Sequence, residues 1–506
     1  MATSIDARAT AATPAQLQSV RGALTSPRRL KTEVLGGLVV ALALIPEAIA
    51  FSIIAGVDPR IGLFASFTMA VTIAFVGGRP AMISAATGAV ALVIAPLVKS
   101  HGLDYLVAAV ILAGIFQIVL GLSGVAKLMR FIPRPVMVGF VNALAILIFL
   151  SQVPELIGVP WLVYPLTALG LLIVFGLPRL TKAVPAPLVA IVALTLITVT
   201  AAVVVPTVGD KGALPDSLPS LSLPNVPNTF ETLQVIFPFA LAMAFVGLLE
   251  SLMTAKLVDD ITDTRSAKTR EAWGQGVANI VTGIFGGMGG CAMIGQTMIN
   301  VKASGARTRI STLLAGVFLL ILVVALGDIV SLIPMAALVA VMIFVSVATF
   351  DWHSIRPATL RALPKSETAV MAATVVVTVA THNLATGVGV GVLVAMVLFA
   401  RRVAHFVTVE RTVTEHDGGQ ATYRVDGELF FASANDLYTQ FEYALDPERV
   451  VIDMRDSHLW DTSTIAALDA ITEKYRQHGK SVDVVGLNQA SALMRERLAG
   501  KLGAGN

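Results

Sequence analysis

Long apolar runs dominate this sequence and limit what it can fold into. A helix needs about 20 mostly apolar residues to cross the ~30 Å hydrocarbon core of a bilayer. Such runs lie near residues 33–56, 59–77, 103–122, 134–153, 161–177, 186–206, 232–256, 270–288, 308–327, 330–350, 367–382 and 384–400. Charged residues make up 14% of the chain, against about 25% in a typical soluble protein. The sequence therefore predicts an α-helical polytopic membrane protein.

Two further hydrophobic pieces are too short to cross the bilayer as complete helices. They lie near residues 83–98 and 291–301, and both are rich in glycine, serine and threonine. We interpret each as a half-helix, which brings the total to about fourteen membrane elements. With that number and a cytoplasmic N-terminus, every cluster of lysine and arginine falls on the cytoplasmic side. The basic residues include Arg28, Arg29, Arg79, Arg265, Lys268, Arg401 and Arg402.

The composition also excludes several classes of protein. The net charge is only +3, and the basic residues sit in short clusters between apolar runs, so nucleic acid is not an expected partner. Cys291 is the single cysteine, which excludes a disulfide framework or a thiolate metal cage, and no cofactor is expected. Residues 1–30 are polar and lack the apolar stretch of a signal peptide. We therefore expect a cytoplasmic segment over 1–27 in a multi-pass protein of the inner (plasma) membrane.

The membrane part divides into two halves of similar length. A proline-rich loop at 207–230 separates residues 30–206 from residues 231–406. Each half opens with a long apolar helix that carries one acid, Glu47 or Glu250, and the short element comes third in each half. An odd number of elements per half inverts the second half, and paired broken segments in inverted halves point to a transporter's binding site. Close helix packing through small residues is the alternative interpretation.

The residue types in the two short elements indicate an anion site built from backbone. Pro80 opposes a helix before the first element and the glycines of 286–290 oppose one before the second, so helices are predicted to begin near Ala85 and Met293. A helix that begins at the bilayer midplane leaves its first N–H groups unpaired, with a partial positive charge that attracts an anion. The predicted substrate-binding residues here are Ser84, Ala85, Ala86, Thr87, Cys291, Ala292, Met293, Ile294, Gly295 and Gln296.

The acids on the two opening helices are candidate coupling groups. Glu47 follows Pro46 deep in the first span, and charged residues at that depth commonly mark ion paths or proton relays. A static interhelical hydrogen bond is the alternative. Glu250 and Thr254 are four residues apart on one helix face, where both present oxygen to a proton or to a hard cation such as sodium. Phe51, one turn after Glu47, is a candidate wall of the substrate site, with core packing as the alternative.

Beyond Arg402 the composition becomes that of a soluble protein. Strands are predicted over 422–425, 427–433, 450–454 and 482–485, and helices over 434–445, 463–478 and 489–498. Alternating strands and helices of this length predict a small α/β domain over residues 407–506. Asp461 is expected to cap the helix that begins near Ser463. Ser463 is also a candidate site of regulatory phosphorylation.

These features together resemble the SulP anion transporters, bacterial relatives of the mammalian carriers of sulfate, chloride, oxalate and bicarbonate. The resembling segments are 45–52, 286–300 and 305–309, and a tail that looks like a STAS domain through 427–433, 452–453 and 461–464. The resemblance implies seven plus seven inverted elements over residues 28–406, divided into core and gate domains, with the first, third, eighth and tenth elements around the substrate. It also implies a homodimer that moves core against gate, and transport of a small anionic substrate without catalysis.

Two departures from the family pattern bear on the substrate. Many members have glutamine where this chain has Glu47, and a Ser–Arg pair where it has Gly295 and Gln296. The exchange removes a fixed positive charge and adds a protonatable acid, which fits a proton-coupled symporter better than a chloride exchanger. The prediction is symport of a C4-dicarboxylate such as fumarate, with sodium-coupled bicarbonate symport or proton-coupled sulfate symport as alternatives. In the tail, Thr464 replaces the glycine that follows the phosphorylated serine of regulated relatives, so regulation at Ser463 stays open.

Functions of other kinds compete with anion transport. A nucleobase permease of the same inverted-repeat fold lacks a STAS tail, which this chain has. A membrane-anchored STAS sensor would use the spans only as an anchor, and matched broken helices with two buried acids would be needless there. An enzyme is disfavoured because the sequence contains no metal-ligand cluster, nucleophile motif or phosphate loop.

Overall fold

The structure, a computed structural model, describes residues 18–124, 132–180, 185–215, 217–404, 407–414 and 419–498. Of the predicted N-terminal segment 1–27, residues 1–17 lie outside the described residues. At the predicted domain boundary between residues 406 and 407, residue 406 also lies outside them. The chain forms two compact units, Met1–Val392 and Leu393–Asn506. The first holds almost all of the membrane helices and the second holds the sheet domain, so each is described by itself.

The first half of the membrane unit contains six complete helices and one broken element, preceded by the short helix α2 (Val20–Leu24). In order, they are α3 (Pro27–Ala55), α4 (Pro59–Val76), β1 (Ser84–Ala85) leading into α5 (Gly88–His101), α6 (Leu103–Leu122), α7 (Arg134–Gln152), α8 (Val163–Leu180) and α9 (Ala186–Thr200). Proline stands in the first turn of α3, α4, α7 and α9. It fits there because the first N–H groups of a helix have no intrahelical partner.

The second half repeats this plan. Its elements are α10 (Phe230–Thr262), α11 (Lys268–Ile284), β2 (Cys291–Ala292) leading into α12 (Ile294–Met298), which continues as a π-helix (Ile299–Ala303), then α13 (Arg309–Ala325), α15 (Met335–Thr349), α17 (Lys365–Thr381) and α18 (Leu384–Ala404). Two short helices, α14 (Gly327–Ser331) and α16 (Pro357–Ala362), lie in the connections. The strand that opens each broken element thus occupies the third place in both halves.

The helices follow the predicted apolar runs. In the described part of the chain, seven helices are long and apolar enough to cross a bilayer, namely α3, α4, α6, α7 with its 3-10 extension, α8, α10 and α18. The helices α5, α9, α13 and α15 are shorter and apolar, and α11, α12 and α17 complete the predicted elements. The largest differences are at helix ends: α3 begins at Pro27 and not near residue 33, α9 ends at Thr200 and not near residue 206, and α10 continues past residue 256 to Thr262. Helices can extend beyond their apolar part, or end before it does.

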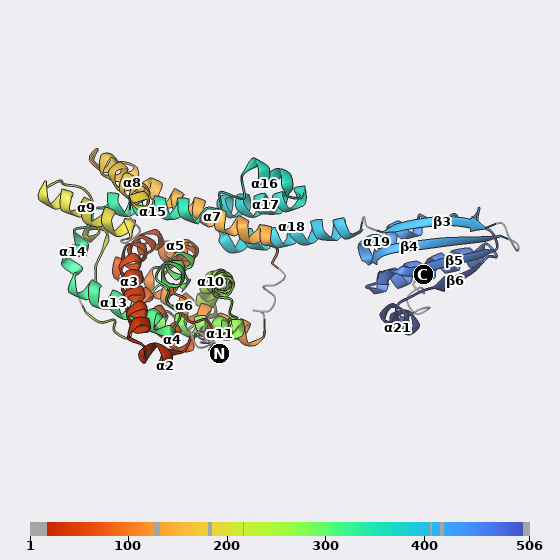
Figure 1. The fold of residues 1–506 in the computed structure, drawn as a ribbon, viewed down its shortest axis with the longest axis horizontal. Coiled ribbons are helices and arrows are strands. Elements are labelled where there is room, and N and C mark those ends of the chain that lie inside the picture. Colours follow the sequence, from red (N-terminus) through yellow and green to blue (C-terminus); the bar gives the residue numbers. More distant parts are fainter. Residues whose placement is uncertain are drawn as a thin grey trace, which may run out of the picture. The chain divides into compact units, whose positions relative to one another are not determined.

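Equivalent helices of the two halves make equivalent contacts. Helix α4 packs against α13 as α11 packs against α6, and α3 packs against α13 as α10 packs against α6. These pairs are the ones that a pseudo-two-fold relation between inverted halves requires. We call α3–α6 with β1 and α10–α13 with β2 the core bundle, and α7–α9, α15 and α17 the gate bundle (Figure 1). The bundles meet where α3 contacts α15 and α9, and where α5 contacts α7.

The C-terminal unit contains a four-stranded sheet of order β3-β4-β5-β6. Its elements are β3 (Thr408–Thr414), β4 (Gln420–Leu429), α19 (Phe431–Tyr438), β5 (Arg449–Leu459), α20 (Thr462–Gln477), β6 (Ser481–Val485) and α21 (Gln489–Leu498). Strand β3 runs antiparallel to β4, whereas β4, β5 and β6 are parallel. Tyr423, Ile452, Leu468 and Tyr475 are fully buried between sheet and helices, which confirms the predicted α/β domain.

Several details of this domain differ from the prediction, among them the end of α19 at Tyr438 instead of residue 445 and the end of β5 at Leu459 instead of residue 454. The strands predicted over 422–425 and 427–433 are one strand, because Gly427 continues the strand at φ 116° instead of turning the chain. The following helix therefore begins at Phe431 and not at residue 434. Strand β3 was not predicted, because its side chains are exposed at nearly every position and it has no apolar alternation to detect.

Candidate functional site

The two broken elements meet inside the core bundle. Ser84 pairs with Ala292 and Ala85 pairs with Cys291 in a short antiparallel ladder. Segments more than 200 residues apart in sequence are therefore joined by backbone hydrogen bonds. Helix α5 begins three residues after β1, and α12 begins two residues after β2. Both helices thus begin beside the same buried strand pair.

The backbone N–H groups that have no hydrogen-bond partner lie a few residues further along the chain than the sequence predicted. The backbone N–H of Ala86 donates to Ser66 Oγ at 3.3 Å, that of Ala292 donates to Ser251 Oγ at 3.0 Å, and that of Met293 donates to the Ile83 carbonyl at 2.8 Å. These predicted anion donors are therefore engaged within the protein. The reason is that each strand extends the chain through the residues where a helix was expected to begin.

The first turns of α5 and α12 carry the unpaired donors. Thr87 caps α5, and its Oγ1 accepts from the Val90 N–H at 3.4 Å. Among the described residues, the N–H groups of Gly88 and Ala89 in α5, and of Ile294, Gly295 and Gln296 in α12, have no hydrogen-bond partner. Unpaired N–H groups at two neighbouring helix ends attract negative charge. This arrangement of donors is suited to an anion, and the two helix starts form the candidate site.

Three side chains of the prediction surround these helix starts. The Phe51 ring packs on α5, since a Cβ placed on Gly88 would lie 2.9 Å from Phe51 Cε1. Glu47, one turn earlier in α3, is half-buried, and its carboxyl interacts with the Gln296 side chain. Gly295 is exposed, and a Cβ added there would meet no atom within 4 Å. Open space therefore adjoins the start of α12 at Gly295, the residue before the one whose side chain meets Glu47.

Glu250 and Thr254 are placed differently. Glu250 is buried, and its Oε2 accepts from Cys291 Sγ at 2.9 Å. The same sulfur lies 3.1 Å from Thr87 Oγ1. Thr254 Oγ1 donates to the Glu250 carbonyl within the same helix at 2.8 Å. The Cys291 side chain thus links the acid of α10 to the cap of α5, and it does not face open space.

The structure also reveals buried polar residues that hold the strand β2 in place. Asn279 Oδ1 accepts from the Gly290 N–H at 2.9 Å, and Asn279 Nδ2 donates to the Gly290 carbonyl at 3.1 Å and to Gln117 Oε1 at 2.9 Å. A Cβ at Gly290 would lie 2.0 Å from the Ala85 carbonyl oxygen, so only glycine allows the two strands to approach this closely.

A similar set of groups holds the chain before β1. Gln275 Nε2 donates to Ser84 Oγ at 2.7 Å, and Asn300 Nδ2 donates to the Ala81 carbonyl at 2.8 Å. Gln275 and Asn279 lie four residues apart on α11 and so share a face with Glu271, four residues earlier. That row of polar residues on a membrane helix was a signal in the sequence that the prediction did not use.

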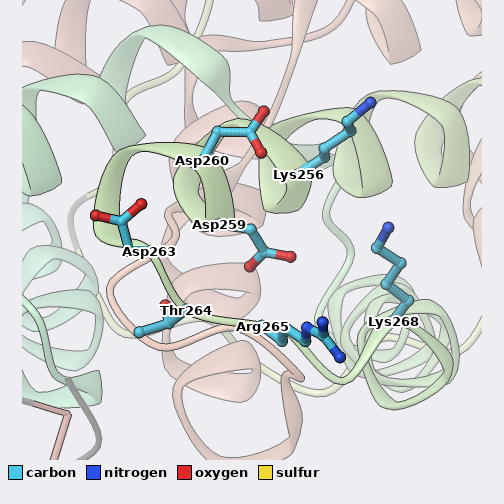
Figure 2. Close-up of a pocket in the computed structure, with 7 residues that line it drawn as sticks. All are labelled: Lys256, Asp259, Asp260, Asp263, Thr264, Arg265 and Lys268. Carbon is cyan, nitrogen blue, oxygen red and sulfur yellow. The ribbon is translucent and has the colours of Figure 1, made fainter.

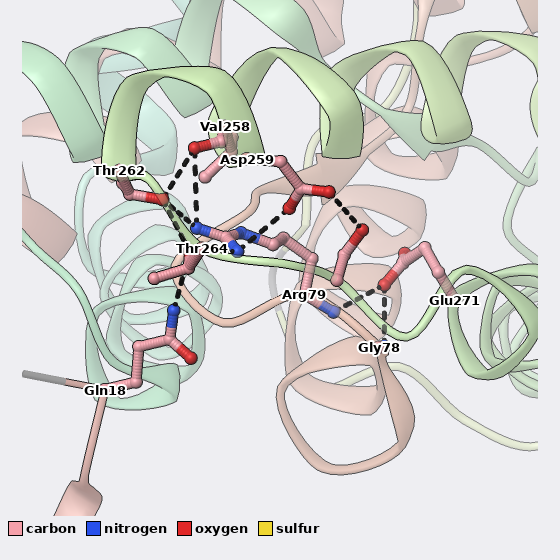
Figure 3. Close-up of polar contacts among 9 residues, drawn as sticks. Gln18, Gly78, Arg79, Val258, Asp259, Thr262, Thr264 and Glu271 are labelled. Atoms are coloured by element: carbon pink, nitrogen blue, oxygen red, sulfur yellow. Dashed lines mark hydrogen bonds and ion pairs between the residues drawn. The ribbon is translucent and has the colours of Figure 1, made fainter. Parts of the chain in front are cut away.

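Arg79 is buried, although its position was predicted to be an ordinary basic loop. Its Nη1 lies 3.0 Å from Asp259 Oδ1 and 2.7 Å from Thr264 Oγ1 (Figure 3). Glu271 Oε2 accepts from the Gly78 and Arg79 N–H groups at 2.7 and 3.0 Å. The cation and the carboxylate together fasten the segment before β1 to the end of α10 and the start of α11. Pairing explains how these charges remain buried.

A polar pocket of about 500 Å³ adjoins this anchor. It is lined by Lys256, Asp259, Asp260, Asp263, Thr264, Arg265 and Lys268 (Figure 2). Its lining carries charges of both signs, and the Asp259 carboxylate already binds Arg79 and Ser266. None of the predicted site residues lines the pocket. The candidate anion site at the broken elements is therefore distinct from this pocket.

In the C-terminal unit, Ser463 is exposed in the first turn of α20. Asp461 caps that helix, and its Oδ1 accepts from the Thr464 N–H at 3.1 Å. The predicted cap is thus present. The carboxylate of Asp461 also accepts from the Phe431 N–H at 2.6 Å, so it joins the starts of α19 and α20.

A helical membrane unit in which two broken elements meet at a buried strand pair has the architecture of a solute carrier. Sequence comparison shows which one: the profile of the sulfate permease family matches residues 30–165 and 160–374. The chain belongs to the sulfate permease family. The profile of the STAS domain matches residues 411–498. Both parts of the resemblance are confirmed.

Individual relatives agree with this assignment. The putative sulfate transporter YbaR of Bacillus subtilis is 54% identical over 93% of this chain and 97% of its own length. The structure of the transmembrane domain of a cyanobacterial bicarbonate transporter, BicA, matches with a TM-score of 0.63 and 26% identity over 71% of this chain and 98% of that chain. Murine Slc26a9, an anion transporter, matches with a TM-score of 0.79 over 94% of this chain and 88% of its own, at 16% identity, which shows a common fold. The protein is an anion transporter of this family and not an enzyme.

Proposed function

We propose that this protein is a proton-coupled symporter of a C4-dicarboxylate such as fumarate. The observation that carries the proposal is the pair of neighbouring helix starts, where five N–H groups have no partner among the described residues and a half-buried acid lies alongside. A dicarboxylate presents a carboxylate at each end, so one can approach the start of α5 and the other the start of α12. Both ends would be held by backbone donors.

Glu47 is the coupling group in this proposal. It interacts with Gln296, a side chain of the helix that offers the donors, and open space adjoins that helix at Gly295. An ionised Glu47 would repel an incoming anion, whereas a protonated Glu47 would not. Binding of the anion and of the proton would therefore favour each other, which is the requirement for symport.

Sodium-coupled bicarbonate transport is the second candidate, because one similar structure is that of a bicarbonate transporter. Sodium would have to bind at Glu250 and Thr254. The groups around Glu250 do not suit sodium: its carboxylate accepts from a thiol, and the Thr254 hydroxyl donates to the carbonyl of its own helix. A hard cation prefers oxygen ligands to sulfur. Proton-coupled sulfate transport is the third candidate.

The test is uptake of radiolabelled fumarate into liposomes that contain the purified protein. An inward proton gradient should drive accumulation, and unlabelled fumarate should compete better than bicarbonate or sulfate at equal concentration. If uptake requires sodium and is unchanged when the proton gradient is collapsed, the coupled ion is sodium, and its site is at Glu250 and Thr254. Competition by bicarbonate alone would replace the dicarboxylate as the substrate.

We further propose that the transporter is a homodimer in the plasma membrane with both termini in the cytoplasm. Residues 28–406 would form the transport domain and 407–506 the cytoplasmic STAS domain, in which the exposed Ser463 is a candidate for regulatory phosphorylation. Protease treatment of sealed, inside-out membrane vesicles should remove the STAS domain, whereas right-side-out vesicles should protect it. A membrane-anchored sensor would show the same orientation but no uptake of any anion.

A further inference from the structure

The connection between α9 and α10 joins the gate bundle to the core bundle. It is long and contains little regular structure. Its hydrogen bonds nevertheless fall into two groups, and each group binds it to one bundle. The boundary between the groups is a single residue, Gly212.

The first part of the connection is fastened to the gate bundle. The Val208 N–H donates to the Ile333 carbonyl at 2.9 Å, and the Met335 N–H, at the start of α15, donates to the Pro206 carbonyl at 2.8 Å. Lys211 Nζ lies 2.7 Å from Glu155, which follows α7 directly. Residues 206–211 should therefore move with the gate bundle.

The later part is fastened to the core bundle. The Arg60 N–H, at the start of α4, donates to the Ala213 carbonyl at 3.1 Å. The Ser222 N–H donates to the Ile284 carbonyl, at the end of α11, at 2.7 Å. The Asn225 N–H donates to Asp104, at the start of α6, at 3.3 Å. Residues 213–215 and 222–225 should therefore move with the core bundle.

Gly212 stands between Lys211, bound to the gate bundle, and Ala213, bound to the core bundle. Its backbone has φ 145° and ψ −177°, a region that side chains rarely allow. A Cβ there would also lie 2.3 Å from Asp58 Oδ1 in the turn between α3 and α4. Glycine is therefore the residue type that lets the chain pass from one bundle to the other at this point.

We infer that Gly212 is the hinge about which the gate-bound segment turns relative to the core-bound segment when the two bundles move. The inference rests on the transport function proposed above and on the movement of core against gate that the family resemblance implies. Rotation about one residue would leave the hydrogen bonds on both sides intact, and hinges of domain movements are often a few loop residues that absorb a large change in φ and ψ. The changes in backbone angle within this connection that accompany movement of the bundles would then be confined to Gly212.

The first experiment replaces Gly212 by alanine, and the matched control is Gly209→Ala. Gly209 lies three residues earlier, has no positive φ, and its Cβ would meet its nearest atom at 3.3 Å. We expect Gly212→Ala to reduce the maximal rate of uptake severalfold with an unchanged half-saturating concentration of the anion, and Gly209→Ala to behave as the parent. Equal rates in all three proteins would overturn the hinge.

A second variant separates the hinge from a simple collision with Asp58. The double change Asp58→Ala and Gly212→Ala removes the carboxylate that a Cβ would meet but keeps the restriction on φ. The hinge predicts that the double variant stays slow. Full recovery of the rate would show that the collision alone slowed Gly212→Ala, and it would refute the hinge.

The closing experiment measures the movement without any transported anion, so that a wrong substrate cannot hide the result. Spin labels at Lys99→Cys in the core bundle and Trp161→Cys in the gate bundle report the distance between bundles; both positions are exposed, and the native Cys291 is fully buried. We expect a broad or two-peaked distance distribution that narrows in Gly212→Ala and not in Gly209→Ala. A distribution that Gly212→Ala leaves unchanged would overturn the hinge, whatever the protein transports.

Discussion

Glu47 and Glu250 occupy equivalent helices of the two halves, yet their surroundings differ. Glu47 is half-buried and interacts with the α12 side chain Gln296, which follows Gly295 and its open surroundings in the chain. Glu250 is buried and bonded to Cys291, which in turn contacts the cap of α5. The pseudo-two-fold plan thus supplies two acids, and local packing leaves one of them half-buried beside α12 and binds the other to Cys291 inside the core bundle.

The largest expected effect is that of Glu47→Gln on proton-driven uptake. Glu47→Gln keeps the size and the hydrogen-bonding capacity of the side chain but cannot exchange a proton. We expect stimulation of uptake by an inward proton gradient to be lost, because an amide cannot take up and release the coupled proton. Flux assays with and without the gradient measure this.

The matched control is Glu231→Gln, which changes an exposed acid in the first turn of α10. It should leave the stimulation as in the parent protein. A Glu47→Gln transporter that still couples to protons would remove Glu47 from the mechanism and erase the difference between the two acids.

The next effect concerns Glu250. Glu250→Gln should retain the response to a proton gradient while lowering the stability of the core bundle by about 2 kcal/mol, because the bond to Cys291 loses its charged acceptor. Thermal unfolding of the purified protein in detergent gives the stability, and the flux assay gives the coupling. If Glu250→Gln abolishes coupling at unchanged stability, the two acids have been assigned the wrong way round.

A smaller effect is expected at Cys291, which connects Glu250 to Thr87. Cys291→Ser retains a donor at this position, whereas Cys291→Ala leaves the buried carboxylate without it. We expect the alanine variant to be less stable than the serine variant by about 1–2 kcal/mol. The comparison of their unfolding temperatures checks this, and identical temperatures would mean that the thiol contact does not hold the frame together.

The smallest effect on stability is expected at Gly295, beside the open space. Gly295→Ala adds one methyl group where no atom lies within 4 Å, and alanine favours a helix over glycine by about 1 kcal/mol. The unfolding temperature should therefore stay the same or rise slightly. Affinity for the anion should fall, because the methyl group occupies space next to the free N–H groups, and competition binding measures that. Unchanged affinity for every anion would place the substrate elsewhere.

Much of the membrane fold could be predicted from apolar runs and small residues. The ends of α6, for example, lie at Leu103 and Leu122, the same residues as in the prediction. Such agreement follows from the bilayer, which requires each spanning segment to satisfy its own backbone hydrogen bonds. Arg79 could not be predicted in this way. Its place in a loop between apolar runs indicates an exposed charge, whereas the structure shows it buried against Asp259 and Thr264.

The sequence by itself determined that the chain is a membrane transporter with two broken elements, two acids on equivalent helices and an α/β tail, because length, apolarity and glycine content act locally. The tertiary structure decided which N–H groups stay free. The segment before β1 engages the Met293 N–H, and side chains from α4 and α10 engage those of Ala86 and Ala292. The available donors therefore move to Gly88 and Gly295 and their neighbours. These partners are distant in sequence, and no local pattern records which of them will meet.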